Sequence, residues 1–511
     1  MKIIRKYIPV FMLVLTVHCM EIKAQAVAGR LDSLFTAPGN FENLNGNVLI
    51  AENGKIIYQR SFGFANFEKK KPNDKASSFN IGSNTKTFTS TAILQLKGKG
   101  KLRLDDPFKK YFPLFPYPSI TIHHLLTHTS GLSDFDMYFA VLKDEPNKIL
   151  TNEDIIPSII KYNKPLKFQP GDDFNYCNTN FELLALLVEK ISGLTYPDYL
   201  KKFIFLPAGM LHSYTQNDPQ KTRDSNLVIN YMPANLYSGS YTNTDSTPRP
   251  MLKQIVYNLG GLIGDGGIIS TVQDMLHYDN ALYNGKLLKT STLEEAYTPM
   301  RLNTGKDYHM FKDLQLGWIH YGLGWMVDVD SSMGRIISHG GHYPGLWSAF
   351  LRNTSKRQTI IIFDNTDWSG ADLISRMALD ILNNKPIVNV LKKKSLASVY
   401  GQSLLVKDAD IAFSKLVELK DDTVHYILRE LDLNALGYQL QDGGYIKQAL
   451  ETFKVNTLLF PSSANVYDSY GDALAGRGEK DGAAIMYKKS SLLNPKNEAE
   501  KTKLKKLMEQ N

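Results

Sequence analysis

The segment FNIGSNTKTFTSTAILQLKGKGKL, residues 79–102, carries a serine and a lysine three positions apart at the start of an amphipathic run. Its apolar residues recur at helical spacing, so the segment predicts a helix with Ser83 in its first turn. Lys86 then lies one turn along on the same face, within reach of the serine hydroxyl. An amine this close takes the hydroxyl proton when burial and nearby cations keep part of it neutral. The segment therefore predicts a nucleophile with its base.

A serine and a lysine at this spacing are weak evidence by themselves. The same spacing occurs at Ser158 and Lys161. Most such pairs are ordinary exposed helix residues, so the rest of the chain has to support the assignment.

Length and composition are those of a soluble globular protein. The chain has 511 residues, which predicts about two to four domains, with 43% hydrophobic and 22% charged residues. The net charge is +8, but no Lys/Arg-dense run has aromatic residues interleaved with it. The charge therefore indicates a solvated surface, and nucleic-acid binding is not expected.

Residues 1–24 have the pattern of a secretory signal peptide, with basic residues followed by an apolar run at residues 8–17. That run is too short for a good membrane span. His18 before Cys19 fits lipoprotein processing poorly, so a periplasmic or secreted protein is favoured over a membrane-anchored lipoprotein. After cleavage only Cys177 remains, so the mature monomer has no internal disulfide.

Strand patterns stand at both ends of the first 385 residues. Residues 46–62 predict a hairpin that turns at Asn53–Gly54. Two or three helical segments occupy 120–205, and short apolar runs from residue 315 onward predict further strands. A helix at 371–382 follows. This order predicts one antiparallel sheet flanked by helices, plus a helical insertion.

The last part of the chain has a different, repetitive pattern. Residues 386–394 look like a linker, and 395–511 are helical in pattern. Four residues recur with a period of 34: Gly437, Ala449, Phe453 and Pro461 are followed by Gly471, Ala483, Tyr487 and Pro495. The repeats at 430–497 resemble tetratricopeptide repeats, which implies a packing or interaction module that binds a protein partner.

Histidines are concentrated in PSITIHHLLTHTSGL, residues 118–132. The spacing of His123, His124 and His128 is compatible with a metal site, but no carboxylate or cysteine stands where a fourth ligand is expected. Packed, hydrogen-bonded histidines are therefore favoured over metal ligands.

Two further stretches carry side chains suited to catalysis. Tyr176 and Asn178 precede a long amphipathic helix, where the tyrosine can relay a proton and the asparagine can hold a substrate amide or orient Lys86. The same spacing recurs in the ordinary helix that contains Tyr278, Asp279 and Asn280.

The sequence His339-Gly340-Gly341 is expected to end a strand, where the glycines let a substrate backbone approach the edge. The backbone N–H of His342 is the best candidate to form an oxyanion hole with that of Ser83. His320-Tyr321-Gly322 is a similar triplet without an expected role.

Six motifs, taken in order, resemble those of the class C β-lactamase-like and penicillin-binding-protein serine hydrolases: IGSNTKTFT, HHLLTHTSGL, FQPGDDFNYCNTNF, GGLIGDGGIISTVQDM, YGLGWMV and SHGGHYPG. The resemblance covers roughly residues 30–385. It implies an α/β domain of the α+β type with an antiparallel sheet and a helical region. It also implies Ser83 as acylated nucleophile, Lys86 as base, Tyr176 and Asn178 as second motif, and His339 with Gly341 as third.

Two residues depart from the family pattern. His339 stands where β-lactamases usually carry lysine, and a histidine is largely neutral near pH 7, so it is less suited to a substrate carboxylate. This resembles the esterases and D-amino-acid peptidases of the family. Cys177 replaces a small residue and is expected to face the core.

The sequence thus predicts an exported serine hydrolase that cleaves an amide or ester of a small-molecule or peptide substrate, without metal or organic cofactor. A D-alanyl-D-alanine carboxypeptidase or endopeptidase, or a weak β-lactamase, is the alternative within the class. A binding protein that lost turnover and works through its repeats is the alternative outside it.

Overall fold

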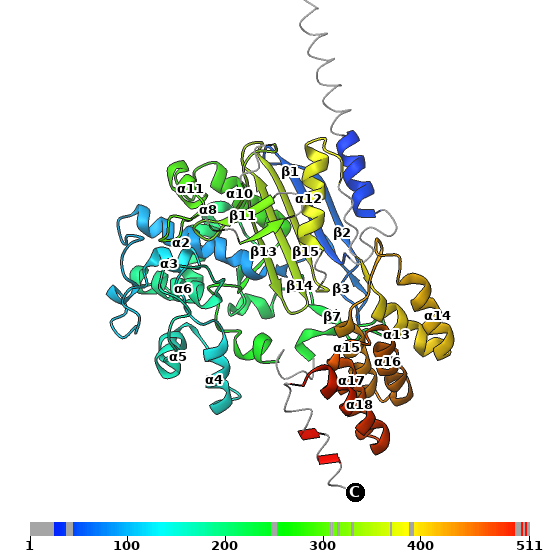
Figure 1. Ribbon diagram of the computed structural model, residues 1–511. Coiled ribbons are helices and arrows are strands. Elements are labelled where there is room, and N and C mark those ends of the chain that lie inside the picture. Colours follow the sequence, from blue (N-terminus) through cyan, green and yellow to red (C-terminus); the bar gives the residue numbers. More distant parts are fainter. Residues whose placement is uncertain are drawn as a thin grey trace, which may run out of the picture. The chain divides into compact units, whose positions relative to one another are not determined.

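The structure is a computed structural model (Figure 1), in which residues 25–36, 44–246, 253–306, 308, 310–313, 317–328, 332–367, 370–387, 393–495, 502–503 and 506–507 are described. The predicted signal peptide, Cys19 and residues 388–392 of the predicted linker lie outside them. The chain divides into two compact units. The sheet unit comprises residues 1–232 and 243–389, and the helical unit comprises 233–242 and 390–511.

The sheet unit is built on an eight-stranded antiparallel sheet with the order β10-β11-β12-β13-β14-β15-β1-β2. The hairpin β1–β2 turns at Asn53–Gly54 as predicted, and β1 pairs with β15, so strands from both ends of the unit meet in one sheet. The strands are β1 Gly46–Glu52, β2 Lys55–Phe62, β10 Phe311–Asp313, β11 Gly317–Tyr321, β12 Met326–Asp328, β13 Ile336–Tyr343, β14 Leu346–Asn353 and β15 Gln358–Asp364.

Both faces of this sheet are covered, so β1, β14 and β15 are buried at almost every position. In β1, Leu49 and Ala51 pack with the larger core, whereas Val48 and Ile50 pack with a second core that includes Ile374. That second core lies under α12 (Ala371–Leu382), which crosses one face of the sheet in Figure 1. The larger core surrounds α2 (Thr85–Gly98) on the other face.

Five α-helices of different lengths lie within residues 120–205, where two or three were predicted. Several are only one or two turns long, too short for a helical period to be visible in the sequence. They are α3 Ile122–Leu126, α4 Asp136–Asp144, α5 Ile155–Tyr162, α6 Asn178–Ser192 and α7 Tyr196–Leu200. Three more helices of this unit are α8 Leu206–Ala208, α10 Val272–Tyr283 and α11 Thr290–Ala296. Minor strands are β3 Phe64–Asn66, β4 Lys71–Pro72, β5 Phe79–Asn80, β6 Tyr214–Thr215, β7 Tyr231–Pro233, β8 Tyr241–Asn243 and β9 Ile268–Ser270.

The helical unit consists mainly of helix pairs, together with one segment from the middle of the chain. The helices are α13 Leu396–Val406, α14 Ala409–Leu419, α15 Glu430–Asp442, α16 Ile446–Leu459, α17 Ala464–Ala475 and α18 Lys480–Leu493, with a short parallel pair, β16 Lys394–Ser395 and β17 Tyr426–Ile427. Residues 233–242 join this unit because the Leu236 amide donates to Gln439 Oε1 at 2.7 Å and its carbonyl accepts from Ser398 Oγ at 2.8 Å. The sequence did not predict this insertion.

The 34-residue period corresponds to a packing contact that occurs twice. A Cβ on Gly437 would lie 2.6 Å from the ring of Phe453, and a Cβ on Gly471 would lie 2.7 Å from the ring of Tyr487. In each pair a helix glycine therefore makes room for an aromatic ring on the next helix.

Gly437→Val is expected to destabilise the helical unit by about 1–3 kcal/mol, because the added methyl groups would overlap the Phe453 ring. Thermal unfolding followed by circular dichroism measures this. Gly476→Ala is the matched control, since the nearest atom to its Cβ would be Asp472 O at 3.4 Å. Equal melting curves for the two variants would contradict the prediction.

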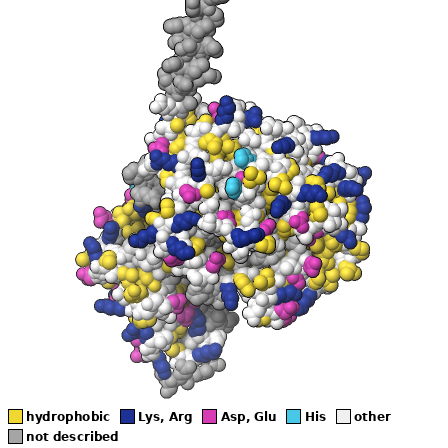
Figure 2. Space-filling view, turned by 180° about the vertical axis from the view of Figure 1, so that it is seen from behind, with side chains coloured by type: hydrophobic (Ala, Val, Ile, Leu, Met, Phe, Trp, Pro, Cys, Tyr) yellow, Lys and Arg dark blue, Asp and Glu magenta, His cyan; other side chains and the backbone are white. Residues whose placement is uncertain are grey.

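The face of the molecule seen in Figure 2 carries scattered charges. Figure 2 shows Lys and Arg side chains spread over one face among acidic and apolar ones, with no single basic patch on that face. No helix within the described residues is both long enough and apolar enough to span a bilayer.

Candidate active site

Ser83 lies in a 3-10 turn, Gly82–Asn84, directly before α2, rather than in the first turn of the α-helix itself. Lys86, in the first turn of α2, points back toward it, and its Nζ donates to Ser83 Oγ at 2.9 Å. The Lys86 side chain is fully buried. The predicted pair is thus brought together, with the lysine out of contact with solvent.

Glycines allow the turn of Ser83 to press against β13. Gly82 has a φ of 51°, and a Cβ there would lie 2.9 Å from the backbone nitrogen of His342. A Cβ on Gly341 would lie 2.2 Å from the carbonyl oxygen of Ile81. The backbone of His342 therefore runs beside the turn of Ser83, which is where the predicted oxyanion hole requires it.

The third motif lies inside a strand, not at its end, because β13 continues to Tyr343 in register with β14. On its other side, β12 pairs only up to Ser338. Within the described part of the sheet, residues 339–343 therefore form a free strand edge next to Ser83. Such an edge offers backbone groups to an extended substrate.

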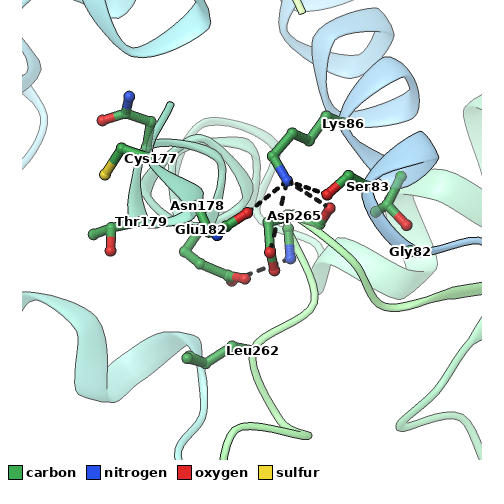
Figure 3. A network of polar contacts seen from close by, with 12 residues as sticks. Gly82, Ser83, Lys86, Cys177, Asn178, Thr179, Glu182, Leu262 and Asp265 are labelled. Carbon is green, nitrogen blue, oxygen red and sulfur yellow. Dashed lines mark hydrogen bonds and ion pairs between the residues drawn. The ribbon is translucent and has the colours of Figure 1, made fainter. Parts of the chain in front are cut away.

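Lys86 uses its three N–H groups on three acceptors (Figure 3). Besides Ser83, these are Asn178 Oδ1 at 2.8 Å and the carbonyl oxygen of Asp265 at 3.1 Å. The Asp265 carboxylate also lies near, with Oδ2 3.7 Å from Nζ. Burial lowers the pKa of Lys86, but Tyr176 and Asp265 raise it by more, so the pKa ends above its ordinary value. Burial, one of the two conditions that favour a neutral lysine, is met, but the charged neighbours are acidic rather than cationic.

Asn178 is held in one orientation by Asp134. Asp134 Oδ1 accepts the backbone N–H of Asn178 at 2.8 Å, and Oδ2 accepts its side-chain Nδ2 at 2.9 Å. The amide oxygen is thereby turned toward Lys86. Asp134 is largely buried, and burial raises its pKa. Sequence reasoning missed Asp134, which stands in a loop without any periodic pattern.

A further carboxyl group lies beneath this cluster (Figure 3). Glu182 is fully buried on α6, and its Oε2 accepts the backbone N–H of Gly264 at 3.1 Å. Burial, together with the neighbouring Asp265 carboxylate, raises the pKa of Glu182 well above its usual range. The sequence contained a sign of this buried carboxyl group, because a glutamate stands inside the apolar run FELLALL, one helical turn after Asn178.

His339 takes part in a buried chain of hydrogen bonds. Its Nε2 lies 3.0 Å from the Tyr321 hydroxyl, which lies 3.2 Å from His128 Nε2. The Cys177 amide donates to His128 Nδ1 at 3.1 Å, so Nε2 of a neutral His128 carries the proton. Burial first, and then Lys86, lowers the pKa of His339 to about 3. His339 is therefore neutral at physiological pH, as its sequence position suggested.

Among the hydrogen-bonded residues, Tyr321 corrects the sequence interpretation, whereas His128 is packed and hydrogen-bonded as expected. Tyr321, set aside with its triplet, contacts His339 directly. His128 stacks on Tyr176, with 4.2 Å between ring centroids, and so supports the second motif. His124 Nδ1 instead accepts from the Thr121 amide in a helix cap. Among the described residues, no group of three His, Cys, Asp or Glu side chains is arranged to hold a metal ion.

Two cavities meet at the predicted nucleophile. One, of about 430 Å³, is lined by Ser83, Asn178 and Asp265. The other, of about 320 Å³, is lined by Ser83 and by His339 and Gly341 of the free strand edge. Tyr176 and His342 line both. Cys177, by contrast, is fully buried, as predicted.

Known proteins are similar to this chain in sequence and architecture. The sequence model of the family described as Beta-lactamase matches residues 38–375. Penicillin-binding protein 4* of Bacillus subtilis (strain 168) is 35% identical over 361 residues, which are 70% of this chain and 76% of that protein. The structure of a penicillin-binding protein from Bacillus halodurans has a TM-score of 0.55 and 28% identity, and the match covers 69% of this chain and 97% of that one. The octameric penicillin-binding protein homologue from Pyrococcus abyssi has a TM-score of 0.57 and 26% identity, and the match covers 70% of this chain and 77% of that one. The predicted fold class is confirmed.

Proposed function

This chain belongs to the β-lactamase family of serine hydrolases, and we propose that it cleaves an amide or an ester through an acyl-enzyme on Ser83. The observation that carries the proposal is the 2.9 Å hydrogen bond between Lys86 Nζ and Ser83 Oγ in a buried setting beside two cavities. A lysine in this position serves as the base that activates a serine nucleophile.

The reaction follows from the contacts around Ser83. The neutral form of Lys86 takes the hydroxyl proton while Ser83 Oγ attacks the substrate carbonyl carbon. The backbone N–H groups of Ser83 and His342 stabilise the negative charge on the carbonyl oxygen. Tyr176 then passes a proton to the leaving group, and water releases the acyl group.

The rate constant kcat/KM for an uncharged ester is expected to rise with pH. Since the pKa of Lys86 is raised above its usual 10.5, most molecules hold the lysine as an ammonium at pH 7. The neutral, reactive fraction grows with pH, so log(kcat/KM) rises by about one per pH unit between about pH 7 and 9. Initial rates measured against a Ser83→Ala blank test this. A plateau that begins near pH 7 would contradict it.

An esterase or a D-peptidase is the activity that the site favours. A β-lactam or a D-alanyl-D-alanine peptide presents a carboxylate, for which a fixed cation is the usual partner. His339, at the third motif, is buried and neutral, and Tyr321 occupies its Nε2. The names of the penicillin-binding relatives favour the cell-wall carboxypeptidase or endopeptidase as second candidate.

Intact mass spectrometry separates these activities. The purified protein is exposed to a fluorophosphonate probe and, separately, to a penicillin, each beside Ser83→Ala. Labelling by the probe that depends on Ser83 establishes the activated nucleophile. A lasting penicillin adduct favours the cell-wall peptidase, and its absence favours an esterase or D-peptidase. Labelling by neither reagent would overturn the proposal and favour a binding protein.

The remaining features extend this proposal. The signal pattern of residues 1–24 supports export to the periplasm or beyond, with lipidation at Cys19 less favoured. The repeated glycine–aromatic contacts support tetratricopeptide-like repeats at 430–497. We propose that these repeats bind a protein partner. If the repeats alone were the working part, deletion of 395–511 would remove the biological effect, whereas Ser83→Ala would not.

A further inference from the structure

Glu182 and Asp265 bring two carboxyl groups together beneath Lys86 (Figure 3). Glu182 is fully buried on α6, whereas the Asp265 side chain is 15% exposed and lines the cavity of about 430 Å³. A hydrogen bond joins the two side chains. Gly264 allows this contact. A Cβ there would lie only 2.3 Å from the backbone oxygen of Phe181, so the turn that carries Asp265 presses on α6.

A hydrogen bond between two carboxyl groups requires a proton on one of them, because ionised carboxylates only accept. The contacts of Glu182 fit the protonated partner. Its Oε2 accepts the N–H of Gly264 at 3.1 Å, and its Oε1 is buried without an N–H donor among the described residues. Asp265 fits the ionised partner, since it is partly exposed and its Oδ2 lies 3.7 Å from Lys86 Nζ. The shared proton is therefore assigned to Glu182.

The other groups around Glu182 agree with a neutral acid. Lys86 is a nearby cation, but its three N–H groups already have other acceptors. Tyr138 on α4 and Tyr196 on α7 also lie near, and burial raises the pKa of both phenols, so both stay neutral. Burial and the Asp265 carboxylate raise the pKa of Glu182 well above its usual range.

We propose that Glu182 is a neutral carboxylic acid whose O–H donates to the Asp265 carboxylate, and that this hydrogen bond keeps the carboxylate from forming a hydrogen-bonded ion pair with Lys86. The proposal rests on the acyl transfer proposed above and adds a positioning residue to it. At 3.7 Å, Asp265 Oδ2 is too far from Lys86 Nζ for a hydrogen bond.

The position of the Asp265 carboxylate matters because Lys86 has only three N–H groups. One of them donates to Ser83 Oγ. Without the O–H of Glu182, the carboxylate would move closer to Lys86, since two opposite charges in a buried site attract more strongly than an ammonium and a neutral hydroxyl. Lys86 would then turn toward Asp265, and Ser83 would lose its base.

Two substitutions of Glu182 test this with p-nitrophenyl acetate as substrate. Glu182→Gln keeps the shape and the zero charge and offers an N–H to Asp265, so kcat/KM should stay within about threefold of the wild-type value. Glu182→Leu removes the donor, so kcat/KM should fall about tenfold or more. An ionised Glu182 predicts another result, because Glu182→Gln would then remove a negative charge near Lys86, lower the pKa of Lys86 and raise kcat/KM.

The Asp265→Asn background shows whether Glu182 acts through Asp265. With the carboxylate gone, adding Glu182→Leu should lower kcat/KM by less than about threefold further. Equal losses in both backgrounds would mean that Glu182 only fills the core, and would overturn the proposal. A change of kcat/KM in Glu182→Gln beyond about threefold, in either direction, would overturn it as well.

Infrared spectroscopy tests the neutral acid without turnover, and it does not depend on the folding of Glu182→Leu. A carboxylic acid has a C=O stretching band that a carboxylate lacks. The wild-type spectrum minus that of Glu182→Gln should contain this band at about pH 7, where an ordinary glutamate is ionised. Its absence would overturn the proposal, while fluorophosphonate labelling of Ser83 in the same sample would leave the serine-hydrolase function standing. No labelling would overturn that function and, with it, the role of Glu182.

Discussion

Ser83→Ala is expected to lower turnover of any confirmed substrate by roughly 10⁴- to 10⁶-fold. The substitution removes the atom that forms the acyl-enzyme, and Lys86 then has no hydroxyl to activate. Stability should change little, because Ser83 contacts the cavities rather than filling a core. Steady-state hydrolysis of an activated ester, with fluorophosphonate labelling of the same preparation, measures the loss.

The chain contains its own control for this experiment. Ser158 and Lys161 have the same spacing on α5, yet Ser158 Oγ donates to the Asp154 carbonyl at 2.6 Å and Lys161 pairs with the exposed Asp144. Ser158→Ala should therefore keep its activity and its labelling. Turnover by Ser83→Ala at the wild-type rate would show that another group is the nucleophile.

Asp279→Ala is expected to destabilise the sheet unit by about 3–5 kcal/mol. Asp279 Oδ1 pairs with Arg352 Nε, and Oδ2 accepts from Thr359 Oγ1 at 2.5 Å. Arg352 and Asp279 are each about 1% exposed. Without the carboxylate, a guanidinium that cannot lose its proton would remain buried, with Tyr297 as its remaining side-chain hydrogen-bond partner among the described residues.

Urea unfolding followed by tryptophan fluorescence measures this loss in the sheet unit, because all four tryptophans lie between residues 318 and 368. Glu294→Ala breaks a comparable but exposed ion pair with Arg335, in which the side chains are 52% and 32% accessible. That control should cost at most about 1 kcal/mol. Similar losses for both variants would refute the view that burial sets the cost.

The sequence contained enough to identify the main side chains for which a catalytic role is proposed. The residues of each motif are close along the chain. Lys86 follows Ser83 by about one helical turn, and Asn178 follows Tyr176 by two residues. The triplet of Tyr278, Asp279 and Asn280 shows why spacing alone fails. In the structure Tyr278 stacks on Phe88 at 4.0 Å and Asp279 holds Arg352, so both serve stability.

What could not be predicted comes from contacts between distant segments. Asp134, Glu182 and Asp265 approach Lys86 from a loop, a helix and a glycine-rich turn, and no single stretch shows them together. The pKa of Lys86 depends on these three carboxyl groups, so its direction could not be predicted from the sequence. Tyr321 was missed for the same reason, since it lies on β11 and His339 on β13, with β12 between the two strands.

More of the fold than of the site could be predicted from the sequence, because the fold depends on residue patterns within single strands. The apolar runs of β1 and β15 and the Asn53–Gly54 turn are local features, and they predicted the antiparallel sheet. The insertion of residues 233–242 into the helical unit is a long-range event. It depends on a hydrogen bond between Leu236 and Gln439, which are about 200 residues apart in the chain. No periodic pattern in the sequence indicates such a contact.

The pairing of β1 with β15 has a consequence for how the protein is made. Residues 46–51 of β1 are buried in the finished sheet, but the partner strand leaves the ribosome about 300 residues later. At 5–20 residues per second that delay is on the order of 15–60 s. During this interval the apolar strand has only β2 beside it, and a lone hairpin is marginal in water. The yield of this protein should therefore depend on the supply of chaperones that shield nascent hydrophobic segments. Aggregates formed without such chaperones should originate at β1.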